Sequence, residues 1–85
     1  MPGLSDTWRS YPLFRLVLEE ILKNPRGIPV KEILDNIKKE HGYDISKPEL
    51  YEVLLRLELR GYITVYRIGK EMMAKPSKYI DKLLS

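Results

Sequence analysis

The chain has 85 residues, a formal net charge of +3 and no cysteine. This length fits one domain with a thin core. The lack of cysteine excludes disulfides, zinc sites built on thiolates and thiol nucleophiles. No apolar run approaches the roughly 20 residues that a membrane-spanning helix needs, and the N-terminal MPGLSDTWRS has no apolar stretch typical of a signal peptide. We therefore expect a soluble, cytoplasmic protein.

The positive charge is concentrated near the C-terminus. Residues 62–85 carry five basic and two acidic side chains, whereas residues 1–61 carry ten of each. A basic patch of this kind is typical of a surface that meets phosphate, although an ordinary solvated surface with lysines explains it equally well. The chain has no glutamine and many Lys, Arg and Glu residues, a composition that leans towards a thermophilic source.

The first predicted element is a helix from Ser10 to about Asn24, which follows a flexible arm over residues 1–9. Ser10 is a suitable N-cap, Pro12 is expected in the first turn, and Pro25 stops the helix. Apolar residues cover most of the circumference. The residues left to face water are Arg15, Glu19, Glu20 and Lys23. Such a helix is expected to lie centrally or in an interface.

A short strand at Ile28 and a second helix over Val30–Glu40 are predicted next, with Gly42 as the helix stop. A last short helix is predicted within residues 77–84. Because a helix of this length is not stable alone in water, it must pack against its own domain or a partner chain, and we regard the two as equally open.

Between these elements, one helix followed directly by a β-hairpin organises the chain. Ser46 and Glu49 form the pattern of a capping box at the start of a helix that runs to Arg60. Its buried face is predicted from the spacing of Leu50, Val53, Leu54 and Leu57. Residues 62–75 then switch to β-branched and aromatic residues around a turn at Gly69.

The predicted order is helix, short strand, helix, helix, strand, strand, helix. A capped helix that leads into a short hairpin is the second half of a winged helix-turn-helix. We therefore predict a mainly α-helical α+β fold of this class, as a single domain over residues 10–85.

The segment HGYDISKPELYEVLLRLELRGYITVYRIG resembles the N-terminal DNA-binding half of ferric uptake regulators. The matching residues are Gly42, Ile45, Ser46, Tyr51, Leu57, Glu58 and Gly61. The same region is equally similar to PadR-type repressors, through the pair Leu50–Tyr51 together with Leu54, Leu57, Glu58 and Gly61. The resemblance covers roughly residues 11–75 and implies a winged-helix DNA-binding domain.

Two departures from ferric uptake regulators affect function. The His and Cys ligands of their metal-binding domain are absent, so we expect no metal and no other cofactor. Glu52 stands where that family has arginine, and Glu49 where it often has threonine. Both glutamates add negative charge to the surface that would face phosphates.

The pattern predicts binding of double-stranded DNA, with residues 46–60 as the recognition helix and residues 62–75 as the wing. The residues expected to contact DNA are Lys47, Tyr51, Arg56, Arg67, Lys70 and Lys75. Lys47 is expected at a phosphate or a guanine edge, and Arg56 at a phosphate. The chain is interpreted as a small prokaryotic or archaeal transcriptional regulator.

The alternative is a winged-helix module that binds protein and not DNA. Tyr51, Leu55 and Leu59 form a second apolar stripe at i, i+4 and i+8, which a helix that reads DNA rarely needs. Packing of another helix of the same chain on this stripe is the simpler explanation. We also predict a homodimer through the first and last helices, since both carry more apolar surface than a thin core covers.

Catalysis is not expected. The single histidine, His41, has Asp44 nearby in sequence, but no third ligand or nucleophile accompanies them. No glycine loop for phosphate binding is present either.

Overall fold

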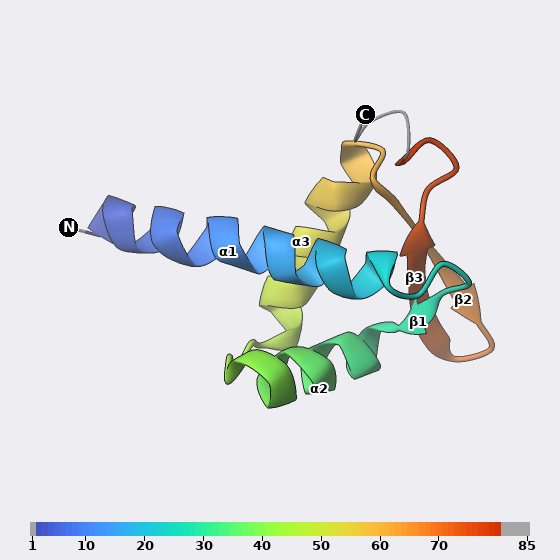
Figure 1. Ribbon diagram of the computed structural model, residues 1–85, viewed down its shortest axis with the longest axis horizontal. Helices are drawn as coiled ribbons and strands as arrows, with labels where there is room; N and C mark the ends of the chain where they lie inside the picture. Colours follow the sequence, from blue (N-terminus) through green and yellow to red (C-terminus); the bar gives the residue numbers. More distant parts are fainter. Residues whose placement is uncertain (1, 81–85) are drawn as a thin grey trace.

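The computed structural model describes the backbone of residues 2–80 and the side chains of residues 12–80. Three helices pack beside a small antiparallel sheet (Figure 1). The elements are α1 (Pro2–Leu22), β1 (Ile28–Pro29), α2 (Val30–His41), α3 (Lys47–Leu59), β2 (Ile63–Ile68) and β3 (Glu71–Pro76). The predicted α+β order is confirmed from the first helix to the hairpin. Residues 81–84 of the predicted helix 77–84 lie outside the described residues, which hold three helices and not four.

Helix α1 differs from its prediction at its start. It begins at Pro2 and not at Ser10, so Pro12 lies inside the helix and not in its first turn. An interior proline costs about 3 kcal/mol in a helix, which is why the sequence favoured a later start. The N-terminal half of α1 extends past α3 and away from the sheet (Figure 1). Of the helices in the described part of the chain, none is both long and apolar enough to cross a membrane.

The predicted end of α2 at Gly42 and the predicted N-cap of α3 at Ser46 are both confirmed. Gly42 takes the left-handed conformation, with φ of +72°, at the end of α2. Ser46 caps α3: its Oγ accepts a hydrogen bond from the Glu49 N–H at 3.3 Å, and its own N–H donates to Glu49 Oε1 at 3.5 Å. This capping box satisfies amide donors that the first turn of a helix leaves unpaired.

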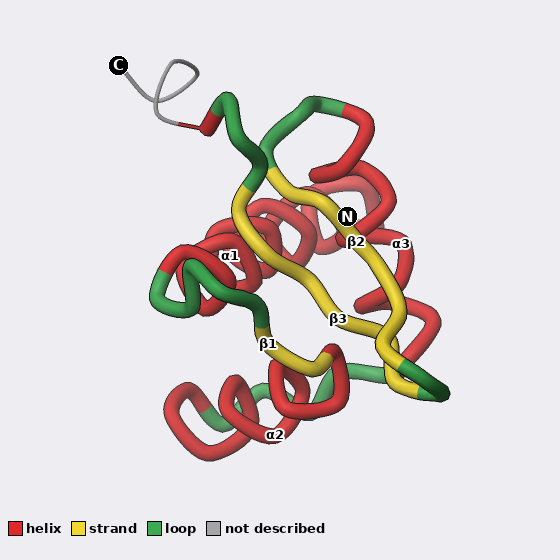
Figure 2. Tube along the Cα trace, turned by 90° about the vertical axis from the view of Figure 1, so that its right-hand side faces the viewer, coloured by secondary structure: helices red, strands yellow, loops and turns green. Residues whose placement is uncertain are grey.

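The sheet has the order β1-β3-β2 (Figure 2). Strand β1 pairs with β3 only at Ile28–Ala74 and Pro29–Met73, whereas β2 pairs with β3 along six positions from Ile63–Pro76 to Ile68–Glu71. The hairpin β2–β3, here called the wing, therefore extends beyond β1 as a two-stranded ribbon. Its turn projects at the lower right of Figure 2.

One apolar core joins all the elements. Its fully buried members come from α1, β1, α2 and α3, and the largest are Val17, Ile21, Ile28, Ile33, Ile37 and Leu50. The wing adds Ile63 and Ala74 to the same core. Burying each large aliphatic side chain contributes about 1.5–3 kcal/mol, so this core fixes the position of the wing base.

Glu20 is a correction to the predicted water-facing side of α1, because its side chain is buried. Its carboxylate accepts hydrogen bonds from Asn36 Nδ2 of α2 at 3.3 Å and from Lys23 Nζ at 3.4 Å. Lys23 also lies 3.7 Å from Glu40 of α2. A buried carboxylate needs such partners, and these partners join α1 to α2.

Candidate nucleic-acid interface

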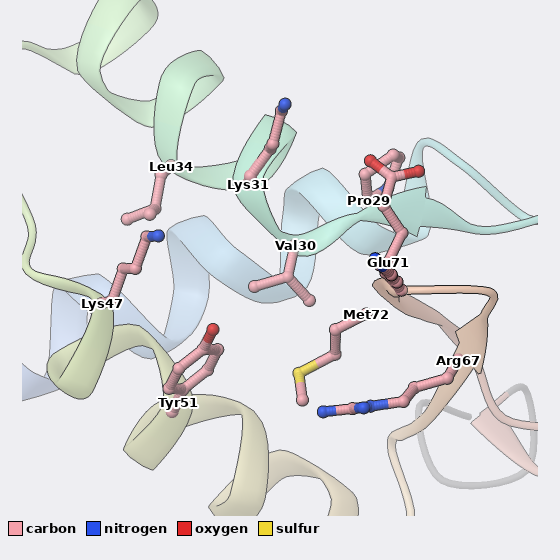
Figure 3. A pocket seen from close by; sticks show the side chains of 10 residues that line it. Pro29, Val30, Lys31, Leu34, Lys47, Tyr51, Arg67, Glu71 and Met72 are labelled. Atoms are coloured by element: carbon pink, nitrogen blue, oxygen red, sulfur yellow. The ribbon is translucent and has the colours of Figure 1, made fainter.

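A hollow of about 190 Å³ opens between the first turns of α2 and α3 and the inner face of the wing (Figure 3). Its walls hold five charged residues and one tyrosine, namely Lys31, Lys47, Tyr51, Arg67, Lys70 and Glu71. Its remaining lining is apolar and includes Val30, Leu34 and Met72. The structure thus brings together four of the six residues predicted to contact DNA.

Three of these side chains converge. Figure 3 shows Lys47 and Tyr51 of α3 pointing into the hollow, and Arg67 of β2 approaching them from the opposite side. Lys47 is the first residue of α3, where the helix dipole adds partial positive charge. Within residues 12–80, neither Lys47 nor Arg67 forms an ion pair, so their charges stay available to a ligand.

The register of the wing explains the position of Arg67. Side chains alternate between the two faces of a strand, so Arg67 and its partner Met72 share the face that carries Val65 and Ala74 towards the core. Near the tip, this face of the wing extends past the apolar core, so the Arg67 side chain lies in the hollow and not among core residues. An arginine on the buried face of a strand is therefore accommodated because the wing projects beyond the body.

Lys75 lies on the other face of the wing. Its partner is Thr64, and its Nζ lies 5.2 Å from the centre of the Tyr66 ring. A cation over an aromatic face is attracted to it by about 0.5–1 kcal/mol at an exposed site. The structure therefore separates Lys75 from the hollow.

Arg56 is also outside the hollow. Its Nη2 donates to Glu52 Oε1 at 2.9 Å, and its guanidinium carbon lies 5.9 Å from the centre of the Phe14 ring of α1. The residue thus belongs to the flank of α3 that faces α1. Its charge is used in contacts within the chain.

The two glutamates that the sequence placed against phosphates do not line the hollow. Glu49 is engaged in the capping box, where its Oε1 also accepts from Ser46 Oγ at 3.2 Å. Glu52 is paired with Arg56. Glu71 is the one acidic residue of the hollow, and in Figure 3 its carboxylate lies near Pro29, turned away from Arg67. The lining therefore carries four positive charges and one negative charge.

Lys31 is a site residue that the sequence analysis missed. Lys31 is the second residue of α2 and its side chain is exposed. Its place beside the hollow arises because the first turns of α2 and α3 meet next to the wing. A lysine in the first turn of the second helix could have been noticed in the sequence, but no local pattern predicts that Lys31 lies beside the same hollow as Lys47.

Glu20 and its partners form a second charged cluster among the described residues. Burial raises the pKa of Glu20, but the neighbouring side chains of Glu40 and Asn36 and the positive charge of Lys23 outweigh burial and lower that pKa overall. The pKa of Lys23 is raised by the charge of Glu20 and then by Glu40. Both shifts favour the charged forms, which suits a structural clasp between α1 and α2. Among the described residues, no group of three or more His, Asp or Glu side chains is arranged to hold a metal ion.

Comparisons with known proteins support the fold. No family model matches the chain, and no curated protein matches it in sequence. Among solved structures, a transcriptional regulator from Clostridium thermocellum, Cth-833, is similar with a TM-score of 0.74 and 25% identity, over 93% of this chain and 78% of that chain. A structure from work on the DNA recognition and protein interaction domains of HOP2 is similar with a TM-score of 0.63 and 20% identity, over 75% of this chain and 97% of that chain. Three helices with a β-wing, together with the similarity to these two structures, identify the architecture as a winged helix. The resemblance to ferric uptake regulators and PadR-type repressors stays a prediction.

Proposed function

We propose that this protein binds double-stranded DNA through the first turns of α3 and the inner face of the wing. The observation that carries the proposal is the convergence of Lys47, Tyr51 and Arg67 on one open hollow, which Lys31 and Lys70 also line. Basic side chains from separate elements that face the same solvent space are suited to a continuous polyanion. The similarity to a transcriptional regulator and to HOP2 supports this choice of ligand.

The dimensions of α3 fit this role. Its 13 residues give a length of about 20 Å, and a helix about 10–12 Å wide enters a major groove about 12 Å wide. Lys47 and Tyr51 lie in its first two turns, the part that contacts base edges in helix-turn-helix proteins. Arg67 and Lys70 are then positioned for the adjacent phosphates.

The decisive experiment is a salt titration of binding to duplex DNA. Each phosphate contact adds about 0.9 to the slope of log K against log salt, so Arg67→Ala with Lys70→Ala should flatten the slope by roughly 1.8. A matched control is Lys38→Ala with Lys39→Ala, which removes the same charge from the last turn of α2, away from the hollow. The control should keep the slope of the unaltered protein.

Two results would contradict the proposal. One is an absence of duplex binding by the unaltered protein at low salt. The other is an equal loss of slope in both double variants, which would mean that only net charge matters and not its position in the hollow.

The finer assignments are proposals on the same basis. We propose a small prokaryotic or archaeal transcriptional regulator, cytoplasmic and without catalytic activity, that acts as a homodimer through α1 and the C-terminal segment. A dimer would place two wings on half-sites about one helical turn apart. The monomer mass is 10.0 kDa, so sedimentation at micromolar concentration that finds only this mass would disprove the dimer.

A second candidate function is favoured by one observation. Leu55 and Leu59 on the outer side of α3 are 55% and 77% exposed, so no described residue covers the stripe that begins at Tyr51. This stripe suits a protein partner. If the chain binds no duplex at any salt concentration, a winged helix that has changed to protein contacts becomes the better assignment.

A further inference from the structure

The tip of the wing carries an exposed isoleucine between two cations. Ile68 ends β2, is 61% exposed, and lies between Arg67 and Lys70 in the chain. An isolated exposed apolar residue needs no explanation on most surfaces. Here it occupies the most projecting part of the ribbon, beyond the point where β1 supports β3.

The tip of the wing is a two-residue turn. Ile68 and Glu71 are paired, so only Gly69 and Lys70 connect the strands. Gly69 has φ of +62°, whereas Lys70 does not have a positive φ, because only glycines do among the described residues. A positive φ at the first central residue of a two-residue turn, and not at the second, is typical of a type II′ turn with glycine at the first position. A side chain on Gly69 would meet nothing within 4 Å, so space around the tip is open.

The chemistry of this tip suits the minor groove of DNA. That groove is about 6 Å wide, and proteins that bend DNA from it insert Phe, Leu, Ile, Met or Pro between base pairs. Ile68 lies on the face of β2 opposite to Arg67, so Arg67 and Lys70, which line the hollow, would meet phosphates on the hollow side of the inserted residue. The negative charge of Glu71 would be repelled by the DNA phosphates, but its carboxylate lies towards Pro29.

We propose that Ile68 is a wedge that enters a base step of the minor groove and bends the DNA. The inference rests on the proposed function and extends it, because it makes the protein an architectural binder and names its apolar contact. The base step is unstacked as Ile68 enters, and the bend brings more of the duplex against Arg67, Lys47 and Lys31. Flexible TA steps, which unstack most easily, should be preferred.

The test uses the full chain and a duplex of about 24 bp with one central TA step, a dye at each end and a fluorescent adenine analogue at the step. Binding of the unaltered protein should raise energy transfer between the dyes, as expected for a bend of roughly 20–90°, and raise the emission of the unstacked analogue. Ile68→Ala should still saturate the duplex with the same salt slope, but lose more than half of both signals and bind about tenfold more weakly. Ile68→Leu should restore them.

A control variant is Leu59→Ala, which removes a more exposed apolar side chain from α3, away from the hollow. It should leave both signals unchanged. If the unaltered protein saturates the duplex without either signal, or if Ile68→Ala bends DNA as well as the unaltered protein does, the wedge is wrong while DNA binding stands. If the unaltered protein does not bind the duplex at low salt, the proposed function and the wedge fail together.

Discussion

The two ends of the wing are made of the same two strands but have opposite surroundings. At the base, Ile63 and Ala74 are buried, and the Tyr66 hydroxyl donates to the Arg26 carbonyl at 3.3 Å. At the tip, Ile68 is largely exposed and Gly69 is surrounded by open space. The base of the wing is therefore held by contacts that stabilise the fold, whereas the tip makes few contacts within the chain and is available to a ligand.

The extent of β1 explains the difference. This strand pairs with β3 only opposite Ala74 and Met73, so the tip is a ribbon of two strands without a third to cover it. At the other edge, Glu58 of α3 accepts a hydrogen bond from the Val65 N–H at 3.1 Å and closes the base of β2. Changes at the base should therefore affect stability, and changes at the tip should affect binding.

Gly27→Ala should have the largest effect and is the strongest way to test the base. A Cβ at this position would lie 2.0 Å from the Tyr66 Oη, and Gly27 has φ of +115°, which other residues rarely adopt. We expect the free energy of unfolding to fall by about 2–4 kcal/mol, from backbone strain and a displaced Tyr66. Urea denaturation measures this change.

Two further variants separate the causes. Gly69→Ala tests a positive φ without a steric contact, and should cost about 1 kcal/mol or less. Tyr66→Phe in the Gly27→Ala background removes the clashing hydroxyl, and should recover part of the lost stability. A Gly27→Ala protein as stable as the parent would show that the wing base is not fixed by this close approach.

Glu20→Ala tests the clasp between the helices that flank β1. It leaves Asn36 and Lys23 without their shared acceptor, and we expect a loss of about 2 kcal/mol in stability at neutral pH. Because the pKa of Glu20 is lowered in the folded state, its contribution is present above the ordinary value of 4.5 and is lost as the pH falls through the folded value.

The thermal unfolding temperature of the parent should therefore fall as the pH drops below the ordinary value of 4.5. Glu20→Ala should show a shallower dependence over the same window. Parallel acid curves for the two proteins would mean that Glu20 is not the group responsible.

Ser77→Ala should have a smaller effect at the base. The Ser77 Oγ donates to the Gly61 carbonyl at 2.5 Å and joins the end of β3 to the start of β2. Its loss should cost about 1 kcal/mol, the net value of one partly buried hydrogen bond. DNA binding at saturating protein should keep its salt slope, since the residue is far along the hairpin from the tip. A change of slope without a change in stability would blur the distinction between the two ends.

The smallest effect on stability is expected at the tip. Arg67→Ala with Lys70→Ala should change the free energy of unfolding by no more than about 0.5 kcal/mol, because both side chains are exposed and form no ion pair among the described residues. Urea curves of this variant and of Lys38→Ala with Lys39→Ala should therefore overlap with the parent. A marked loss of stability in the tip variant alone would show that the tip supports the fold.

Local patterns in the sequence determined much of the fold. The capping box of Ser46 and Glu49, the left-handed Gly42 and the β-branched and aromatic hairpin around Gly69 each depend on residues a few positions apart, and all are present in the structure. The α+β order of the described elements followed from them. The predicted start of α1 was wrong because the helix continues through the interior Pro12, a position that local helix preference disfavours.

Only the tertiary structure decided which charges are used within the protein and which face a ligand. Lys47 and Arg67 are 20 positions apart in the sequence and share one hollow, whereas Arg56 and Lys75 are turned to Glu52 and Tyr66. The buried Glu20 depends in the same way on Asn36, which lies on the next helix. Coulomb and hydrogen-bond energies depend on distance in space, and a chain of 85 residues sets those distances only when its helices and sheet have packed.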